Sequence, residues 1–156
     1  MPRFITLVFT SLALMMPFTV SARAQDIITT ADPHTVLKIA QQFGIAILDT
    51  DSAGDPIIGG EMDGQTYVIS FYGCSNNRDC KQLLLTTVWE DTGVSLRAVN
   101  DWNSERLFGR AYINGDQDLF VEFGFNLDFG ITIENLTDNI DWFKVLMSDA
   151  EQQLVN

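Results

Sequence analysis

The sequence predicts an α+β domain in which helices pack on a twisted antiparallel sheet. Two observations lead to this class. Short segments of alternating apolar residues follow one another along the chain, with tight turns between them. Three other segments carry apolar residues three or four positions apart, as amphipathic helices do. The order is helix, three or four strands, helix, two strands, long helix. This order allows every hairpin to close locally, with the helices on one side of the sheet.

The first 24 residues predict a secretory signal peptide. Arg3 gives a positive start, residues 4–20 are almost wholly apolar, and Ala22 and Ala24 fit a signal-peptidase site after Ala24. The alternative is an uncleaved anchor, but the apolar run is shorter than the roughly 20 residues that span a bilayer. We therefore expect a periplasmic or secreted protein. Its mature part, residues 25–156, would form one domain with no stable membrane insertion.

The first expected elements are a helix and a short strand. The helix is predicted over 33–43, because Asp32 can cap it, Pro33 suits its first position and Gly44 can end it. A short apolar strand over 46–48 should follow. An acidic turn then leads to the next strand.

A hairpin and a central strand are expected next. Segments 57–62 and 65–72 should pair across a tight turn at Asp63 and Gly64. Segment 83–88 is apolar on both faces, which predicts a central strand covered on two sides. One face of the second hairpin strand should carry Tyr67, Ile69 and Phe71.

The second half repeats this scheme. A helix should begin at Val94 or Ser95, followed by strands over 108–113 and 119–127, and then by a long helix capped by Thr132. One side of the earlier helix carries Leu96, Val99, Trp102 and Arg106. The long helix has an apolar stripe formed by Ile133, Leu136, Ile140, Phe143, Met147, Ala150 and Leu154.

The two cysteines, Cys74 and Cys80, predict a disulfide, because an exported chain meets oxidising conditions. The closed loop is short, so the bridge should contribute roughly 2–3 kcal/mol to stability. A redox or metal-binding pair is the alternative. It is disfavoured because the spacing is not that of a CxxC motif and no histidine lies near.

The charge of the chain limits its partners. The whole chain has a formal charge of −12, with nine basic and twenty-one acidic side chains. Without Arg3 and Arg23 the balance is seven against twenty-one, a charge of −14. Such a surface repels nucleic acid and anionic lipid, and it suits a basic or neutral protein partner.

No catalytic or metal-binding pattern stands out in the sequence. Serine-hydrolase, zinc-protease, P-loop and Rossmann motifs are missing. The acidic turn 49–55 begins like a calcium loop, but Ala53 and Gly60 occupy positions that should supply oxygen ligands. His34 is the one histidine, and no nucleophile can be paired with it. We therefore expect a protein that is not an enzyme and needs neither cofactor nor metal.

One polar and aromatic segment stands out between the second helix and the next strand. In the structural interpretation, Asn and Arg side chains meet the free carbonyls of the helix end, and Arg106 pairs with an acidic strand residue such as Glu122. In the alternative, Arg106 or Arg110 holds an anion in a pocket. The structural role is favoured, and the pocket stays open. The segment contains Trp102, Asn103, Arg106, Phe108, Arg110 and Tyr112.

These residues resemble the signature of the YbjN family. The family is described as bacterial sensory-transduction regulators, and the likeness covers about residues 30–154. Segments 122–127 and 130–132, with the long helix after them, are similar to the family's C-terminal half. Phe71-Tyr-Gly-Cys74 before a second cysteine resembles its exported members. The resemblance implies a fold similar to that of type III secretion chaperones, which are often dimeric and bind extended client segments.

The resemblance implies a binding module with no established catalytic residues. The signal peptide and the cysteine pair depart from the cytoplasmic members, which argues against a chaperone role in the cytosol. We expect an exported, non-catalytic interaction module with a chaperone-like or regulatory role. It would bind a protein partner and could form a homodimer. The alternative is a small-ligand or envelope-stress sensor with a pocket near Arg106 and Arg110.

Overall fold

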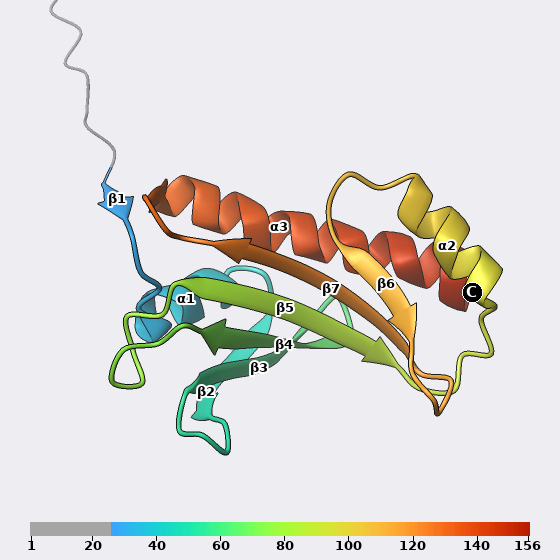
Figure 1. Cartoon of the computed structure of the whole chain (residues 1–156), viewed down its shortest axis with the longest axis horizontal. Coiled ribbons are helices and arrows are strands. Elements are labelled where there is room, and N and C mark those ends of the chain that lie inside the picture. The colour runs from blue at the N-terminus through green and yellow to red at the C-terminus, as the bar shows by residue number, and fades with distance from the viewer. Residues whose placement is uncertain (1–25) are drawn as a thin grey trace, which may run out of the picture.

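The computed structural model describes residues 26–156 (Figure 1). The predicted signal peptide, residues 1–24, lies outside this range. Within it, none of the helices combines the length and apolarity needed to cross a membrane.

The predicted α+β class is confirmed: six antiparallel strands form one twisted sheet, and helices pack on it (Figure 1). Its strand order is β2 (Ile45–Thr50), β3 (Pro56–Met62), β4 (Gln65–Tyr72), β5 (Gln82–Trp89), β7 (Leu119–Asn126) and β6 (Arg110–Ile113). The helices are α1 (Pro33–Ala40), α2 (Leu96–Ser104) and α3 (Ile133–Ala150), and α3 continues into the π-helical turn η1 (Glu151–Val155). A second, two-stranded ladder joins β1 (Ile27–Ile28) to β8 (Ile131–Thr132).

The core lies between one face of the sheet and the helices α1 and α3. Tyr67, Ile69 and Phe71 are buried on this face, as predicted. The rings of Tyr67 and Phe143 meet edge to face, with their centroids 6.5 Å apart. The predicted stripe of α3 supplies the opposite wall through Leu136, Ile140, Phe143, Met147 and Ala150.

Three predicted boundaries are wrong. The first helix ends at Ala40, and the next strand covers 45–50 because all six of its residues pair with β3. Phe108 lies outside β6, because Gly109 has a φ of +77° and turns the chain before the strand begins at Arg110. Such a backbone angle favours glycine.

The expected cover on both faces of segment 83–88 is also wrong. This segment lies in β5, which is central in the sheet between β4 and β7. Its Leu85 is fully buried, whereas Leu84, Thr86 and Val88 on the opposite face are half-buried. The helices therefore cover one face, and the other face stays open.

The predicted disulfide between Cys74 and Cys80 is present. It closes the connection between β4 and β5, and Cys80 is fully buried. The backbone N–H of Ala31 donates to the carbonyl of Cys80 at 2.7 Å. This hydrogen bond ties the segment that leads into α1 to the disulfide-closed end of the sheet.

Candidate functional site

The two edges of the sheet differ, and β6 forms the closed one. The side-chain amide of Asn103 in α2 donates to the carbonyl of Ala111 at 2.9 Å, and its oxygen accepts the Ala111 N–H at 2.8 Å. An edge strand normally leaves such groups unpaired, so that another strand can add. Asn103 takes the place of that strand. The expectation that Asn103 meets the carbonyls of the helix end is therefore wrong.

The helix α2 is held in place by a partly buried cluster around Asp149. The indole N–H of Trp102 donates to Asp149 at 2.9 Å, and Arg106 donates to the same carboxylate through Nε at 2.8 Å and through Nη2. Nη1 of Arg106 lies 3.3 Å from the carbonyl of Trp102, and the guanidinium lies over the Trp102 ring. The side chain of Arg106 is 14% exposed. All its nitrogens are engaged, so this arginine stabilises the fold.

The expected pairing of Arg106 with Glu122 is wrong, because Arg110 takes that carboxylate. Arg110 and Glu122 are opposite each other in the register of β6 and β7, with Nε at 2.8 Å and Nη2 at 2.6 Å from Oε2. Tyr112 donates to the other oxygen at 3.0 Å, and its ring stacks on Phe120. Burial and the bond to Glu122 raise the pKa of Tyr112, while the bond to Glu122 raises that of Arg110. An anion at Arg110 would have to compete with a buried carboxylate.

The six residues of the predicted motif therefore do not form one pocket. Trp102, Asn103 and Arg106 join α2 to α3 and to the edge of the sheet. Arg110 and Tyr112 lie on the open face, around Glu122. The ring of Phe108 is half-exposed and points elsewhere, toward α3.

The strand β2 forms the other edge, and no strand of the described chain pairs with its outer side. Gln41 donates to the carbonyl of Ala46 at 3.3 Å, so the backbone groups of Ala46 point outward. Those of Leu48 do the same, because the direction alternates along an antiparallel strand. The neighbouring Ile45 and Ile47 have side chains 63% and 67% exposed. Gln41 thus takes the outward carbonyl of Ala46, and the edge offers the Ala46 N–H and the backbone groups of Leu48 beside two exposed aliphatic side chains.

The open face of the sheet continues from this edge. Apolar side chains cover much of it, although none of the helices within residues 26–156 packs there. We call this surface the open face; its apolar members are Ile45, Ile47, Ile57, Val68, Tyr72, Leu84, Val88 and Phe120. An apolar patch with a polar rim is typical of an interaction site.

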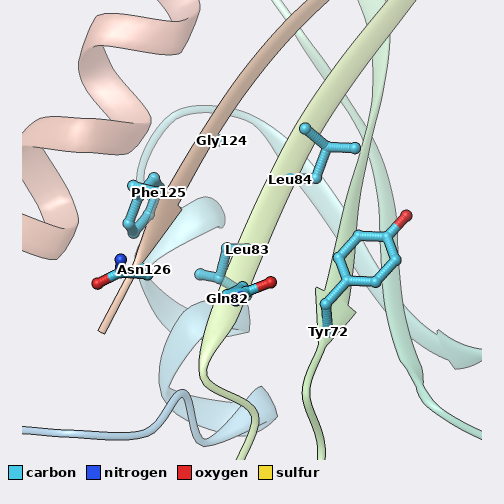
Figure 2. A pocket seen from close by; sticks show the side chains of 7 residues that line it. All are labelled: Tyr72, Gln82, Leu83, Leu84, Gly124, Phe125 and Asn126. Atoms are coloured by element: carbon cyan, nitrogen blue, oxygen red, sulfur yellow. The ribbon is translucent and has the colours of Figure 1, made fainter. Parts of the chain in front are cut away.

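A shallow hollow of about 500 Å³ lies at one end of the open face (Figure 2). Tyr72 and Leu84 project from the sheet on the same side, whereas Phe125 points toward α3. Gly124 supplies no side chain, and a Cβ there would lie 3.3 Å from Leu84. The amide side chains of Gln82 and Asn126, which are opposite each other in the register, complete the lining.

Sequence reasoning missed this hollow. The signal was Gly124, a glycine inside an otherwise regular strand, which often marks a place where something approaches the backbone. The disulfide lies close by, because Tyr72 and Gln82, which pair with each other, flank the loop that it closes.

The acidic turn is a local structure. Oδ1 of Asp51 accepts the N–H groups of Ala53 and Asp55, at 2.8 and 2.9 Å. Over residues 26–156, no three His, Cys, Asp or Glu side chains are grouped so as to hold a metal ion.

Comparison with known proteins identifies relatives of this chain. The profile of the YbjN family, described as "Putative bacterial sensory transduction regulator", matches residues 32–154. A solved structure described as "YbjN, a putative transcription regulator from E. coli" is 13% identical, with a TM-score of 0.49; the alignment covers 84% of this chain and 100% of that one. The search of curated proteins found no match.

Proposed function

This chain belongs to the YbjN family, and we propose that it acts as an exported, non-catalytic protein-binding module. The observation that carries this proposal is the difference between the two sheet edges. Asn103 closes β6 through both backbone groups of Ala111, whereas on β2 Gln41 takes only the Ala46 carbonyl and leaves the outward backbone groups of Leu48 open beside exposed Ile47. Extended segments bind such edges by adding a strand.

The proposed occupant of the β2 edge is an extended segment of another envelope protein. Its backbone would bond to Leu48 and to the N–H of Ala46, and every second side chain would pack beside Ile45 and Ile47 on the open face. The segment would also carry lysine or arginine, because the described part of the chain has three times as many acidic as basic residues. The proposed role is to bind an extended segment that carries basic and apolar side chains.

Export is part of the same proposal. The signal peptide that the sequence predicts over residues 1–24 supports it, and a disulfide persists best in an oxidising compartment. The periplasm would be the place where the client is met.

Site-specific crosslinking in the envelope fraction tests the proposal. A photoreactive amino acid at Ile45 should crosslink to a protein segment of the predicted composition. The added substitution Ile47→Lys should abolish the crosslink, because a lysine on an edge strand opposes pairing. The matched control is Leu96→Lys on α2, since Leu96 is 69% exposed and Ile47 is 67% exposed.

The control should leave the crosslink unchanged. A crosslink that survives Ile47→Lys, or a linked segment that is acidic or helical, would overturn the assignment of the β2 edge. Recovery of no protein, together with a tightly bound small molecule, would overturn the protein-binding function.

A second candidate is the sensing of a small ligand. The hollow at Gly124 favours it, because its volume of about 500 Å³ lies in the range of ligand sites and Gln82 and Asn126 offer amide groups. The site would then lie on the open face, away from Arg106. Chemical shifts of the Gln82 and Asn126 side-chain amides on addition of an envelope extract freed of protein would test it.

A further inference from the structure

A second groove, of about 320 Å³, lies between β7 and α3, on the side of the sheet opposite the open face. We call it the aromatic groove. Phe123, Phe125 and Asn126 line it from β7, Phe108 from the loop before β6, and Asn135, Asp138, Asn139 and Trp142 from α3. Neither the disulfide nor the β2 edge takes part in it.

Two aromatic rings form the exposed walls of the groove. Phe108 and Trp142 are 50% and 47% exposed, and their ring centroids are 6.3 Å apart with the planes at 54°. Phe123 holds Phe108 from behind in an edge-to-face contact at 6.3 Å. Two rings inclined in this way leave part of each π face open to a ligand.

Gly109 makes this arrangement possible. Its backbone has a φ of +77°, and a Cβ would lie 2.7 Å from a methyl group of Leu146 in α3. Glycine therefore allows the loop to approach α3 closely enough for Phe108 to meet Trp142.

The polar part of the groove consists of one carboxylate and three amide side chains, so its only charge is negative. Asn135, Asp138, Asn139 and Trp142 are spaced so that they share one side of α3. The amide nitrogen of Asn139 donates to Asn135, which leaves the Asn139 oxygen free to accept. Asp138 is exposed, and its carboxylate has no hydrogen bond or ion pair within residues 26–156. The lining contains no basic side chain.

We propose that the aromatic groove binds an arginine side chain of a partner protein. Aromatic faces attract cations, and arginine also stacks on aromatic rings through its planar guanidinium. A carboxylate such as that of Asp138 can accept two of its N–H groups at once. An anionic ligand is disfavoured, because no positively charged side chain lines the groove. The site goes beyond the β2 edge and does not depend on it.

Nuclear magnetic resonance with a small probe tests this assignment. The probe is Nα-acetyl-arginine N-methylamide, and its citrulline analogue is a neutral control of nearly the same shape. The arginine compound should shift the indole N–H of Trp142 in a saturable way, while the buried Trp102 indole stays unchanged. The citrulline compound should shift the Trp142 signal little.

Substitutions sharpen the test. Asp138→Asn should weaken binding of the arginine compound roughly twofold to fivefold. Asp116→Asn is the matched control, because it removes the same charge from a distant exposed turn and should have no effect. Equal shifts with arginine and citrulline, no shift up to the solubility limit, or equal losses in both variants would each overturn the proposal. Ile47→Lys should leave probe binding intact, so failure of the β2 proposal would be recognised separately.

Discussion

At the residue scale, one carboxylate organises the junction between α2 and α3. Asp149 accepts hydrogen bonds from Trp102 in α2 and from Arg106 just after this helix. These two residues precede Asp149 in the sequence by 47 and 43 positions. Because the arginine side chain is mostly buried, removing this partner would leave its positive charge without compensation. The junction also positions Asn103, whose amide closes the β6 edge.

Replacing Trp102 by alanine tests the strength of this junction. Trp102 is 3% exposed, so Trp102→Ala should lower the free energy of unfolding by about 3–5 kcal/mol. The control is Trp142→Ala, because Trp142 is 47% exposed and should cost under about 2 kcal/mol. Urea unfolding followed by circular dichroism measures both. Similar losses in the two variants would contradict the structural role of Trp102.

Tyr67 predicts a loss of stability at alkaline pH. Burial raises the pKa of its phenol to about 12, from the ordinary value of 10. Between these two values the unfolded chain loses the proton while the folded chain keeps it, so stability falls as the pH rises. The loss should reach about 1 kcal/mol at pH 11.

The measurement is the urea midpoint at pH 8 and at pH 11. Tyr67→Phe should remove about 1 kcal/mol of the alkaline loss, since phenylalanine has no proton to release. Tyr72→Phe is the control, because Tyr72 is 48% exposed. The same alkaline loss in Tyr67→Phe as in the unmodified chain would show that another group is responsible.

The roles of some single residues could be predicted from the sequence, and those of others could not. Trp102 could be predicted as an anchor because it lies on the apolar side of a helix. The partner of Arg106 could not, since it depends on how α2 docks against the far end of α3. The pairing of Arg110 with Glu122 depends on the register of β6 and β7. The alternation of side chains cannot predict this register, because a shift of two residues leaves the same side chains on each face.

At the element scale, the two sheet edges differ because of α2, the helix that connects β5 to β6. α2 lies beside β6 (Figure 1). Its Asn103 side chain bonds to both backbone groups of Ala111. Asn103→Ala should leave the Ala111 N–H and carbonyl unpaired, with a loss of about 1–2 kcal/mol. Asn139→Ala, which removes an exposed bond within α3, should cost less than about 0.5 kcal/mol. Thermal unfolding of both variants measures the difference, and equal effects would contradict the edge-closing role.

The disulfide stabilises the connection between β4 and β5. Replacing Cys74 and Cys80 together by serine should cost roughly 2–3 kcal/mol and lower the melting temperature by roughly 5–10 °C. A reducing agent should lower the melting temperature of the unmodified chain by a similar amount and leave the double variant unaffected. An unchanged curve in the reduced protein would mean that the bridge contributes nothing to stability.

The order of the elements could be predicted because each of the longer ones has its own periodicity. The two-residue strands β1 and β8 could not, since a pair of residues has no period. The hollow at Gly124 and the aromatic groove were also beyond the sequence, because they depend on side chains that different elements bring together. The groove is the clearer case: its Phe108 was expected in a strand, and Gly109 turns it toward Trp142.

At the scale of the whole molecule, the dominant electrostatic feature is a large negative net charge. Residues 26–156 contain seven basic and twenty-one acidic side chains. Of the ion pairs, Arg97–Asp101 and Lys81–Asp128 are largely exposed and contribute little, whereas Arg106–Asp149 is sheltered. Repulsion among the remaining carboxylates therefore outweighs local pairing at low salt.

Salt should consequently stabilise the folded protein. Raising sodium chloride from about 10 mM to about 0.1 M shortens the Debye length from about 30 Å to about 10 Å, which screens this repulsion. The melting temperature should rise by a few degrees, because the folded state holds the carboxylates closer together than the unfolded state does. Neutralising the exposed side chains in Glu90→Gln, Asp116→Asn and Asp141→Asn should raise the low-salt melting temperature and reduce the gain from salt. A melting temperature that falls with salt would mean that attraction within ion pairs outweighs the repulsion of the net charge.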